Sequence, residues 1–254
     1  MSDKTLAGAV ALVTDAGSDI GAGTAHRLAR EGATVALVAR SGDRLDQVAD
    51  DIRNLGGHAI EMAADITDPE RACQAVQDTH DRLGRLDILV NNAGIVLLDT
   101  ALHAPLDEWD RLVALNVTAL LHLTHAAVPY LIDAAATSPR QVADLVNVSL
   151  TAGQLTRQGS SVYNLTRSGL EGFTESLRRE LLVERVRVGL VEPAVVEPRL
   201  VNHFGTTTRT AVRRPAAGRE TLRPEDVADA IAYVVTRDRR VAVSEMRVHA
   251  AGPS

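Results

Sequence analysis

The 254-residue sequence contains one cysteine, Cys73, and its aromatic residues amount to only 2% of the total. A single cysteine excludes a disulfide within the chain and a metal site built from several cysteines. Cys73 falls in a helical pattern, so we expect it to be a small buried residue. The scarcity of aromatic rings and a net charge of −6 argue against nucleic-acid binding, which favours basic surfaces and stacking platforms.

Long apolar runs and targeting signals are also lacking. No run in the sequence approaches the roughly 18 apolar residues that cross a bilayer, so no membrane partner is expected. The first residues, Met1 to Thr5, lack the charged-then-apolar pattern of a secretory signal, which predicts a cytoplasmic location. There is no linker, repeat or low-complexity segment, and 45% of residues are apolar. Residues 1–254 therefore read as one domain with a large core.

Apolar strand patterns alternate with helical patterns along the whole chain. Strands are predicted at 9–14, 34–39, 59–63, 86–90, 142–148, 186–191 and 246–248, and helices at 22–31, 44–55, 69–83, 106–135, 161–183 and from 224 onward. Asp68 before Pro69 is the expected N-cap of the third helix. This alternation predicts an α/β fold, in which helices cover both faces of a parallel sheet.

The first strand, turn and helix form the kind of unit that seats a pyrophosphate in dinucleotide-binding folds. Its turn carries Asp15 and Asp19 where such a loop favours glycine. A carboxylate at Asp19 would face a diphosphate charge, and two unit charges about 4 Å apart repel by about 4 kcal/mol at an effective dielectric near 20. Alternatively, both side chains turn outward and cap the helix N-terminus, where carboxylates are favourable. Either arrangement disfavours a phosphate at this place.

Several motifs occur in a fixed order along the chain: Asn91-Asn92-Ala93-Gly94, Asn116 within Leu-Asn-Val, Asn147-Val148-Ser149, Tyr163 near a helix start, Glu192-Pro193, and Pro224-Glu225-Asp226-Val227-Ala228. In these motifs and their spacing the chain resembles the short-chain dehydrogenase/reductase family over nearly its whole length. The closing Glu245–Val248 and the stretch after Asn92 are most similar to NADP-dependent carbonyl reductases of the clavulanic acid dehydrogenase type.

The resemblance implies a doubly wound, three-layer Rossmann fold, with a seven-stranded parallel sheet in the order 3-2-1-4-5-6-7. It also implies hydride transfer between NADP(H) and a small carbonyl or alcohol, in a homodimer or homotetramer. Tyr163 is then the acid or base, Asn116 belongs to a proton relay, and Arg167 takes the place of a lysine that lowers the pKa of the tyrosine. The cofactor-binding residues that the resemblance implies are Gly17, Ile20, Gly21, Arg40, Asp65, Ile66, Asn92, Ala93 and Gly94.

The chain departs from the family pattern at several of these positions. Of the three loop glycines only Gly21 remains, and an arginine is not a conservative replacement for the lysine. Leu150 stands at the place of the catalytic serine; Ser149 or Thr151 beside it substitutes only if the backbone shifts, because adjacent residues of an extended segment face opposite ways. Beyond Pro193 the family glycine is Ala194 and the family threonine is Pro198.

Three functions stay open on these grounds. The first is a repurposed member whose dinucleotide binding and hydride transfer are weakened or lost, and which binds a small molecule or pairs with an active paralogue. The second is an active NADP(H)-dependent oxidoreductase that works with Arg167. The third is acid–base chemistry by Tyr163 without redox. Residues 199–223 take the place of a substrate lid, and His122 with His125 lack a third ligand, so no metal site is predicted.

Overall fold

The computed structural model describes residues 4–149, 158–194, 196 and 221–251. Leu150, Thr151, Pro198 and positions 199–220 of the predicted lid lie outside the described residues. The described part forms seven parallel strands, namely β1 (Val10–Thr14), β2 (Thr34–Ala39), β3 (His58–Ala63), β4 (Ile88–Asn91), β5 (Ala143–Val148), β6 (Val186–Pro193) and β7 (Glu245–Val248). They lie in the order β3-β2-β1-β4-β5-β6-β7, which confirms the predicted fold.

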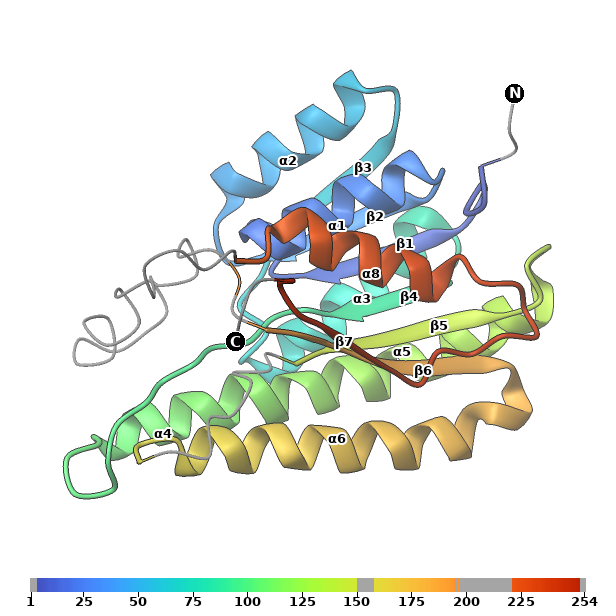
Figure 1. The fold of residues 1–254 in the computed structure, drawn as a ribbon. Coiled ribbons are helices and arrows are strands. Elements are labelled where there is room, and N and C mark those ends of the chain that lie inside the picture. The colour runs from blue at the N-terminus through green and yellow to red at the C-terminus, as the bar shows by residue number, and fades with distance from the viewer. Residues whose placement is uncertain (1–3, 150–157, 195, 197–220, 252–254) are drawn as a thin grey trace.

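Helices cover both faces of the sheet (Figure 1). One layer holds α1 (Asp19–Arg30), α2 (Gly42–Asn54) and α8 (Pro224–Val235). The other holds α3 (Pro69–Leu83), α4 (Leu106–Val113), the π-helix η1 (Ala114–Ala119), α5 (Leu120–Thr137) and α6 (Ser161–Leu181), which the 3-10 turn η2 (Leu182–Glu184) follows. The chain therefore has the three layers expected of a doubly wound fold.

The strands are apolar on both sides because each face of the sheet packs against helices. In β1, Ala11 and Val13 belong to the core under α1, α2 and α8, whereas Leu12 between them belongs to the core under α3, α5 and α6. The two-residue period of a strand produces this alternation. The two cores fix the sheet between its helical layers.

Most predicted elements are confirmed, and two details differ. Helix α1 begins at Asp19, earlier than expected, because Ser18 is its N-cap and accepts a hydrogen bond from Gly21 N at 3.2 Å. Cys73 is exposed, so its predicted burial is wrong. The buried stripe of α3 is formed by Ala72, Ala75, Val76 and Thr79, and a step of about 100° per residue turns Cys73 away from that stripe. As predicted, Asp68 caps α3 by accepting from Glu70 N and Arg71 N.

One continuous helical stretch, Leu106–Thr137, is long and apolar enough to cross a membrane by length and composition alone. It reaches this level by mean hydropathy, although polar residues such as His122, His125 and Asp133 interrupt its apolar runs. In the fold, α5 packs its apolar face, including Leu123, Ala127 and Leu131, into the core beneath the sheet. A core helix produces the same apolar signal as a membrane-spanning helix.

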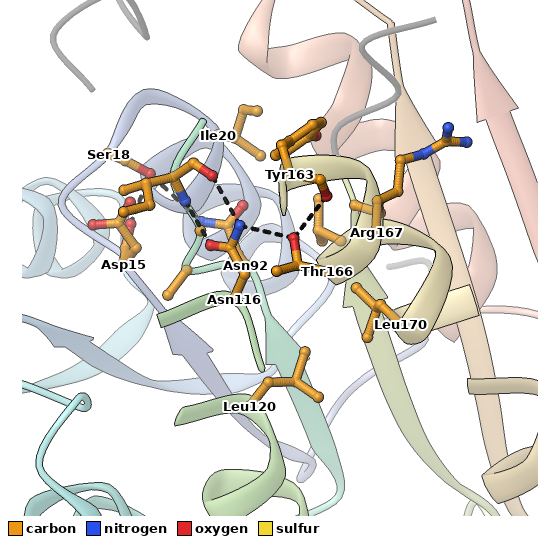
Figure 2. A pocket seen from close by; sticks show the side chains of 15 residues that line it. Asp15, Ser18, Ile20, Asn92, Asn116, Leu120, Tyr163, Thr166, Arg167 and Leu170 are labelled. Carbon is orange, nitrogen blue, oxygen red and sulfur yellow. Dashed lines mark hydrogen bonds between the residues drawn. The ribbon is translucent and has the colours of Figure 1, made fainter. Parts of the chain in front are cut away.

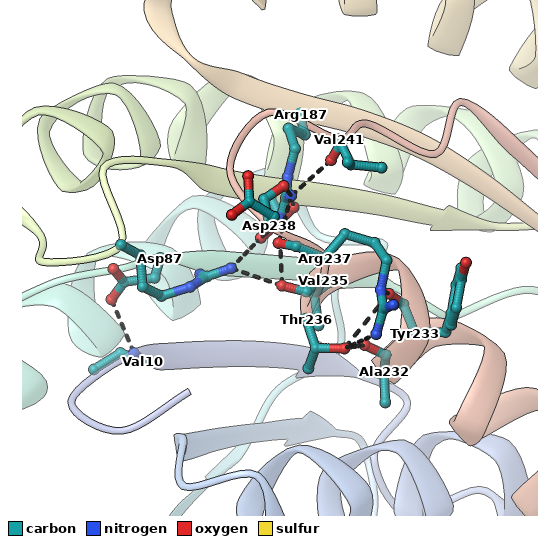
Figure 3. Close-up of polar contacts among 12 residues, drawn as sticks. Val10, Asp87, Arg187, Ala232, Tyr233, Val235, Thr236, Arg237, Asp238 and Val241 are labelled. Atoms are coloured by element: carbon teal, nitrogen blue, oxygen red, sulfur yellow. Dashed lines mark hydrogen bonds and ion pairs between the residues drawn. The ribbon is translucent and has the colours of Figure 1, made fainter. Parts of the chain in front are cut away.

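A buried ionic cluster lies at the amino ends of the central strands (Figure 3). Arg187 on β6 pairs with Asp144 on β5 at 2.7 Å. It also donates to the carbonyl oxygens of Val235, the last residue of α8, and of Arg237, Asp238 and Val241 beyond it. Asp87 before β4 is fully buried and accepts from Val10 N at 2.9 Å. These charged residues hold the strands together at their amino ends. The cavities lie at the opposite, carboxyl ends of the strands.

Candidate active site

Two neighbouring cavities lie at the carboxyl ends of the parallel strands, and the start of α6 borders the first of them. The first, of about 50 Å³, is lined by Asp15, Ser18, Ile20, Asn92, Ala93, Gly94, Ile95, Asn116, Leu120, Val148, Ser149, Tyr163, Thr166, Arg167 and Leu170. Figure 2 shows Asp15, Ser18 and Asn92 on one side of it and Tyr163 and Arg167 on the other. The fold therefore brings together the predicted catalytic residues Asn116, Tyr163 and Arg167.

The second cavity, of about 230 Å³, lies beside the first. Its lining is Asp15, Val38, Ala39, Arg40, Ala64, Asp65, Ile66, Thr67, Ala93, Gly94, Ile95, Arg111, Ala114 and Leu115. The predicted residues Arg40, Asp65, Ile66, Ala93 and Gly94 thus share one cavity. Arg111 on α4 also lines it, and sequence reasoning missed this residue because nothing in a helical arginine distinguishes it from a solvated surface charge.

The loop after β1 is shaped by the backbone of Asp15. Asp15 has φ +51°, a left-handed conformation that favours glycine and that aspartate tolerates better than most residues. Its carbonyl oxygen accepts from Ser18 N and Ser18 Oγ, at 2.9 and 2.7 Å. A Cβ on Gly21 would lie 2.2 Å from that oxygen. Gly21 is thus required by the close approach of α1 to this turn.

The two loop carboxylates occupy different places. Asp15 borders both cavities, whereas Asp19 is a half-buried residue of the first turn of α1 and lines neither of them. Ser18, and neither aspartate, supplies the side-chain N-cap, so the expectation that both carboxylates cap α1 is wrong. Of these two loop carboxylates, Asp15 is the one that brings negative charge to the cavities. Gly17 lines neither cavity; a Cβ there would lie 3.1 Å from Arg44 Cβ.

Thr14 holds the turn after β4 against the end of β1. Its Oγ1 accepts from Asn92 N at 2.9 Å and from Ala93 N at 3.0 Å. Asn92 Nδ2 in turn donates to Thr14 O at 3.1 Å. The Asn-Asn-Ala-Gly motif therefore has a structural task, since it joins two strands where the cavities begin.

Asn116 lies in the π-helix η1, a wider turn of a kind that often occurs at functional sites. Its amide forms two hydrogen bonds with Ile95, accepting from Ile95 N and donating to Ile95 O, both at 2.9 Å. A longer contact of 3.5 Å joins it to Thr166 Oγ1, which donates to Tyr163 O at 2.8 Å. Asn116 is thus fixed beside Tyr163 by backbone contacts.

Tyr163 is 4% exposed and belongs to a small apolar cluster with Ile95, Val96 and Leu112. Burial raises the pKa of the Tyr163 phenol well above its usual value; nearby Arg167 acts to lower it, and Glu192 acts to raise it. Desolvation prevails because the charged phenolate loses its hydration in an apolar cluster. At neutral pH this tyrosine is a neutral phenol.

Arg167 forms ion pairs through Nη2, with Glu171 Oε1 at 2.9 Å and Glu192 Oε1 at 3.0 Å. Glu192 has no exposed side-chain surface and also pairs with Arg247 Nε at 2.9 Å. Sequence reasoning missed the role of Glu192, because its partners come from α6 and from β7, far away along the chain. The cation at the place of the family lysine is therefore shared with carboxylates.

Two polar residues complete the walls of the cavities. Ser149 is buried and lines the first one. The second polar residue is Asp65, in the second cavity. Hydrogen bonds from the Thr67 side chain and backbone, with a smaller contribution from Arg40, hold the pKa of Asp65 below its usual value despite partial burial.

Within the described ranges, no group of three or more histidine, cysteine or acidic residues is placed to hold a metal ion.

A sequence model described as short chain dehydrogenase matches residues 9–208 of the chain. The chain belongs to the short-chain dehydrogenase/reductase family. Its family relatives include an oxidoreductase of Staphylococcus aureus strain USA300, described as uncharacterised, which is 30% identical over 94% of this chain and 96% of its own.

Solved structures of family members have the same fold. A 3-ketoacyl-(acyl-carrier-protein) reductase from Brucella melitensis complexed with NADH has a TM-score of 0.83 and 31% identity, covering 97% of this chain and 98% of that one. A metagenomic short-chain oxidoreductase in complex with NADP has a TM-score of 0.79 and 31% identity, covering 96% and 98%. Short-chain dehydrogenases of known structure thus align with this family member over nearly its full length.

Proposed function

We propose that this short-chain dehydrogenase/reductase derives from NADP(H)-dependent carbonyl or alcohol oxidoreductases and that its dinucleotide binding and hydride transfer are weakened or lost. The observation that carries the proposal is the position of Asp15, which borders both cavities. The retained task is the binding of a small molecule, in a cytoplasmic homodimer or homotetramer or beside an active paralogue.

One half of the site fits an NADP molecule. Arg40 at the second cavity suits a 2′-phosphate, whereas NAD-binding proteins place an acidic residue there. Asp65 and Ile66 border the same cavity, as expected of adenine contacts, and a family member of known structure is in complex with NADP. A bound nicotinamide would supply the hydride, but Asp15, Ala194 and Pro198 disfavour its binding.

The diphosphate is the part of the cofactor that the site does not fit. It would pass the junction of the two cavities, where Asp15 lies. At about 4 Å and an effective dielectric near 20, one pair of unit charges repels by about 4 kcal/mol, and that corresponds to about a thousandfold in affinity. Ala194 and Pro198 add to the departures on the nicotinamide side.

The test is a fluorescence titration of the protein with NADPH and with NADH. We expect no saturation at micromolar nucleotide for the natural sequence. Asp15→Gly removes the charge and suits the φ of +51°, so binding should strengthen by about two to three powers of ten. Asp19→Gly is the matched control and should change affinity little, since Asp19 lines neither cavity.

Micromolar binding by the unaltered protein would contradict the proposal and favour an active NADP(H)-dependent oxidoreductase. Failure of Asp15→Gly to restore binding would place the obstacle at Ala194 and Pro198 instead of at Asp15. Acid–base chemistry without redox is the remaining candidate. It would use the protonated phenol of Tyr163, which lines the first cavity. The raised pKa keeps that phenol protonated but makes it a weak acid, away from the near-neutral pKa that suits general acid–base catalysis. Turnover without nucleotide that disappears in Tyr163→Phe would establish this function.

A further inference from the structure

The buried carboxylate of Glu192 lies between two arginines, Arg167 and Arg247. Its Oε1 accepts a hydrogen bond from Arg167 Nη2 at 3.0 Å, and its Oε2 accepts one from Arg247 Nε at 2.9 Å. The parallel register of β6 and β7 pairs Glu192 directly with Arg247. The carboxylate has no exposed surface, and burying it is affordable only because both of its oxygens are paired with cations.

The same contacts determine where the Arg167 guanidinium lies. Both of its ion pairs to the described residues use Nη2, one to Glu171 on its own helix and one to Glu192. Its Nε–H is buried and has no hydrogen-bond partner within the part of the chain that the structure describes. In Figure 2 the guanidinium lies on the far side of Tyr163 from Asp15 and Asn92. Acidic partners, and not the phenol, therefore orient this cation.

We propose that Glu192 is a positioning residue that holds Arg167 by its Nη2 and thereby weakens the help that this cation gives to ionisation of the Tyr163 phenol. The inference deepens the proposed function, on which it rests, because it names a contact that acts beside burial to disfavour the phenolate. Among the described residues, the charged groups around the phenol are Asp15 across the cavity, Arg167 on α6, Glu192 on β6 and, paired with Glu192, Arg247 on β7. Removing the charge of Glu192 leaves Arg167 with Glu171, at a half-exposed position, as its one carboxylate partner among the described residues.

The experiment measures the ionisation of Tyr163 without any nucleotide. A fluorinated tyrosine, whose phenol is more acidic, is incorporated at Tyr130, Tyr163 and Tyr233, and Tyr163→Phe assigns the relevant ¹⁹F NMR signal. In Glu192→Gln we expect the pKa of that phenol to fall by about one unit, because the buried carboxylate that opposes Arg167 is gone. Glu192→Asp keeps the charge and should stay close to the unaltered protein.

Glu171→Gln is the matched control, because it removes the other partner of Arg167 at a half-exposed position and should shift the phenol little. An unchanged pKa in folded Glu192→Gln would overturn the proposal. If that variant does not fold, Arg247→Gln replaces it: Glu192 then loses its outer cation, so the pKa of Tyr163 should rise, and an unchanged value would again overturn the proposal. No nucleotide enters these titrations, so their outcome is independent of the Asp15→Gly test.

Discussion

Tyr163 is a buried phenol whose pKa is raised because its anion would lose hydration in an apolar cluster. The unfolded chain exposes the same phenol with an ordinary pKa near 10. Above that pH the unfolded chain releases a proton that the folded protein keeps, so the folded state binds more protons and stability must fall as pH rises.

We therefore predict that the free energy of unfolding decreases above about pH 10 by up to about 1.4 kcal/mol per pH unit because of Tyr163. Tyr163→Phe lacks the titrating group and should show a shallower decrease. Urea unfolding of both proteins between pH 9 and 11 measures the difference. Parallel pH profiles for the two proteins would mean that this phenol ionises in the folded state as readily as in the unfolded one.

At the scale of elements, the contact between β1 and the turn after β4 depends on one hydroxyl. Thr14 is fully buried, and its Oγ1 accepts from two consecutive amides, those of Asn92 and Ala93. The chain leaves the sheet after β4, so its backbone amides can no longer bond to a neighbouring strand. The Thr14 hydroxyl at the end of β1 accepts from these amides instead. The walls of both cavities begin at this point.

Thr14→Val keeps the shape and removes the acceptor, so that Ala93 N loses its hydrogen bond to Oγ1 and Asn92 N keeps only its 3.1 Å contact with Val90 O. We expect a loss of about 1–3 kcal/mol in stability and faster hydrogen exchange at the amides of Asn92 and Ala93, measured by NMR. Thr14→Ser retains the oxygen and should keep these two amides protected. If the amides stay equally slow in the valine variant, the hydroxyl is not what holds this turn.

At the scale of the whole molecule, Arg187 joins β5, β6 and the segment after α8. Its guanidinium pairs with Asp144 and donates to four backbone carbonyl groups, and its side chain is 8% exposed. Arg187 therefore fastens the end of α8 and the segment after it to β5 and β6, together with Arg140, which donates to Asp144 and to Val235 O, both at 2.7 Å.

Breaking a buried pair costs more than a surface pair, because the remaining charge is left in a poorly hydrated place. Arg187→Met should lower the free energy of unfolding by about 3–5 kcal/mol, measured by urea denaturation. Arg240→Ala removes an exposed pair with Asp238 and should have no measurable effect. Equal stability of both variants would show that Arg187 contributes no more than a surface charge.

The layered fold could be predicted from the sequence because its strands and helices are strongly periodic, and the ordered motifs located Asn116 and Tyr163 beside one cavity. Three features could not be predicted. The pairing of Glu192 depends on residues 25 and 55 positions away. Ser18 is the N-cap of α1, after a turn in which Asp15 has a left-handed conformation. Local spacing does not show which of the two loop carboxylates borders a cavity. Each depends on contacts between distant segments.

The left-handed turn at Asp15 has a consequence for inheritance. The backbone there already has the φ that glycine favours, so a glycine would enter without any rearrangement of the loop. Aspartate and glycine codons differ at a single base. One point mutation therefore separates this protein from a form without the obstructing carboxylate. Selection for dinucleotide binding could restore the glycine in a single step, and its absence could let the aspartate return in a single step.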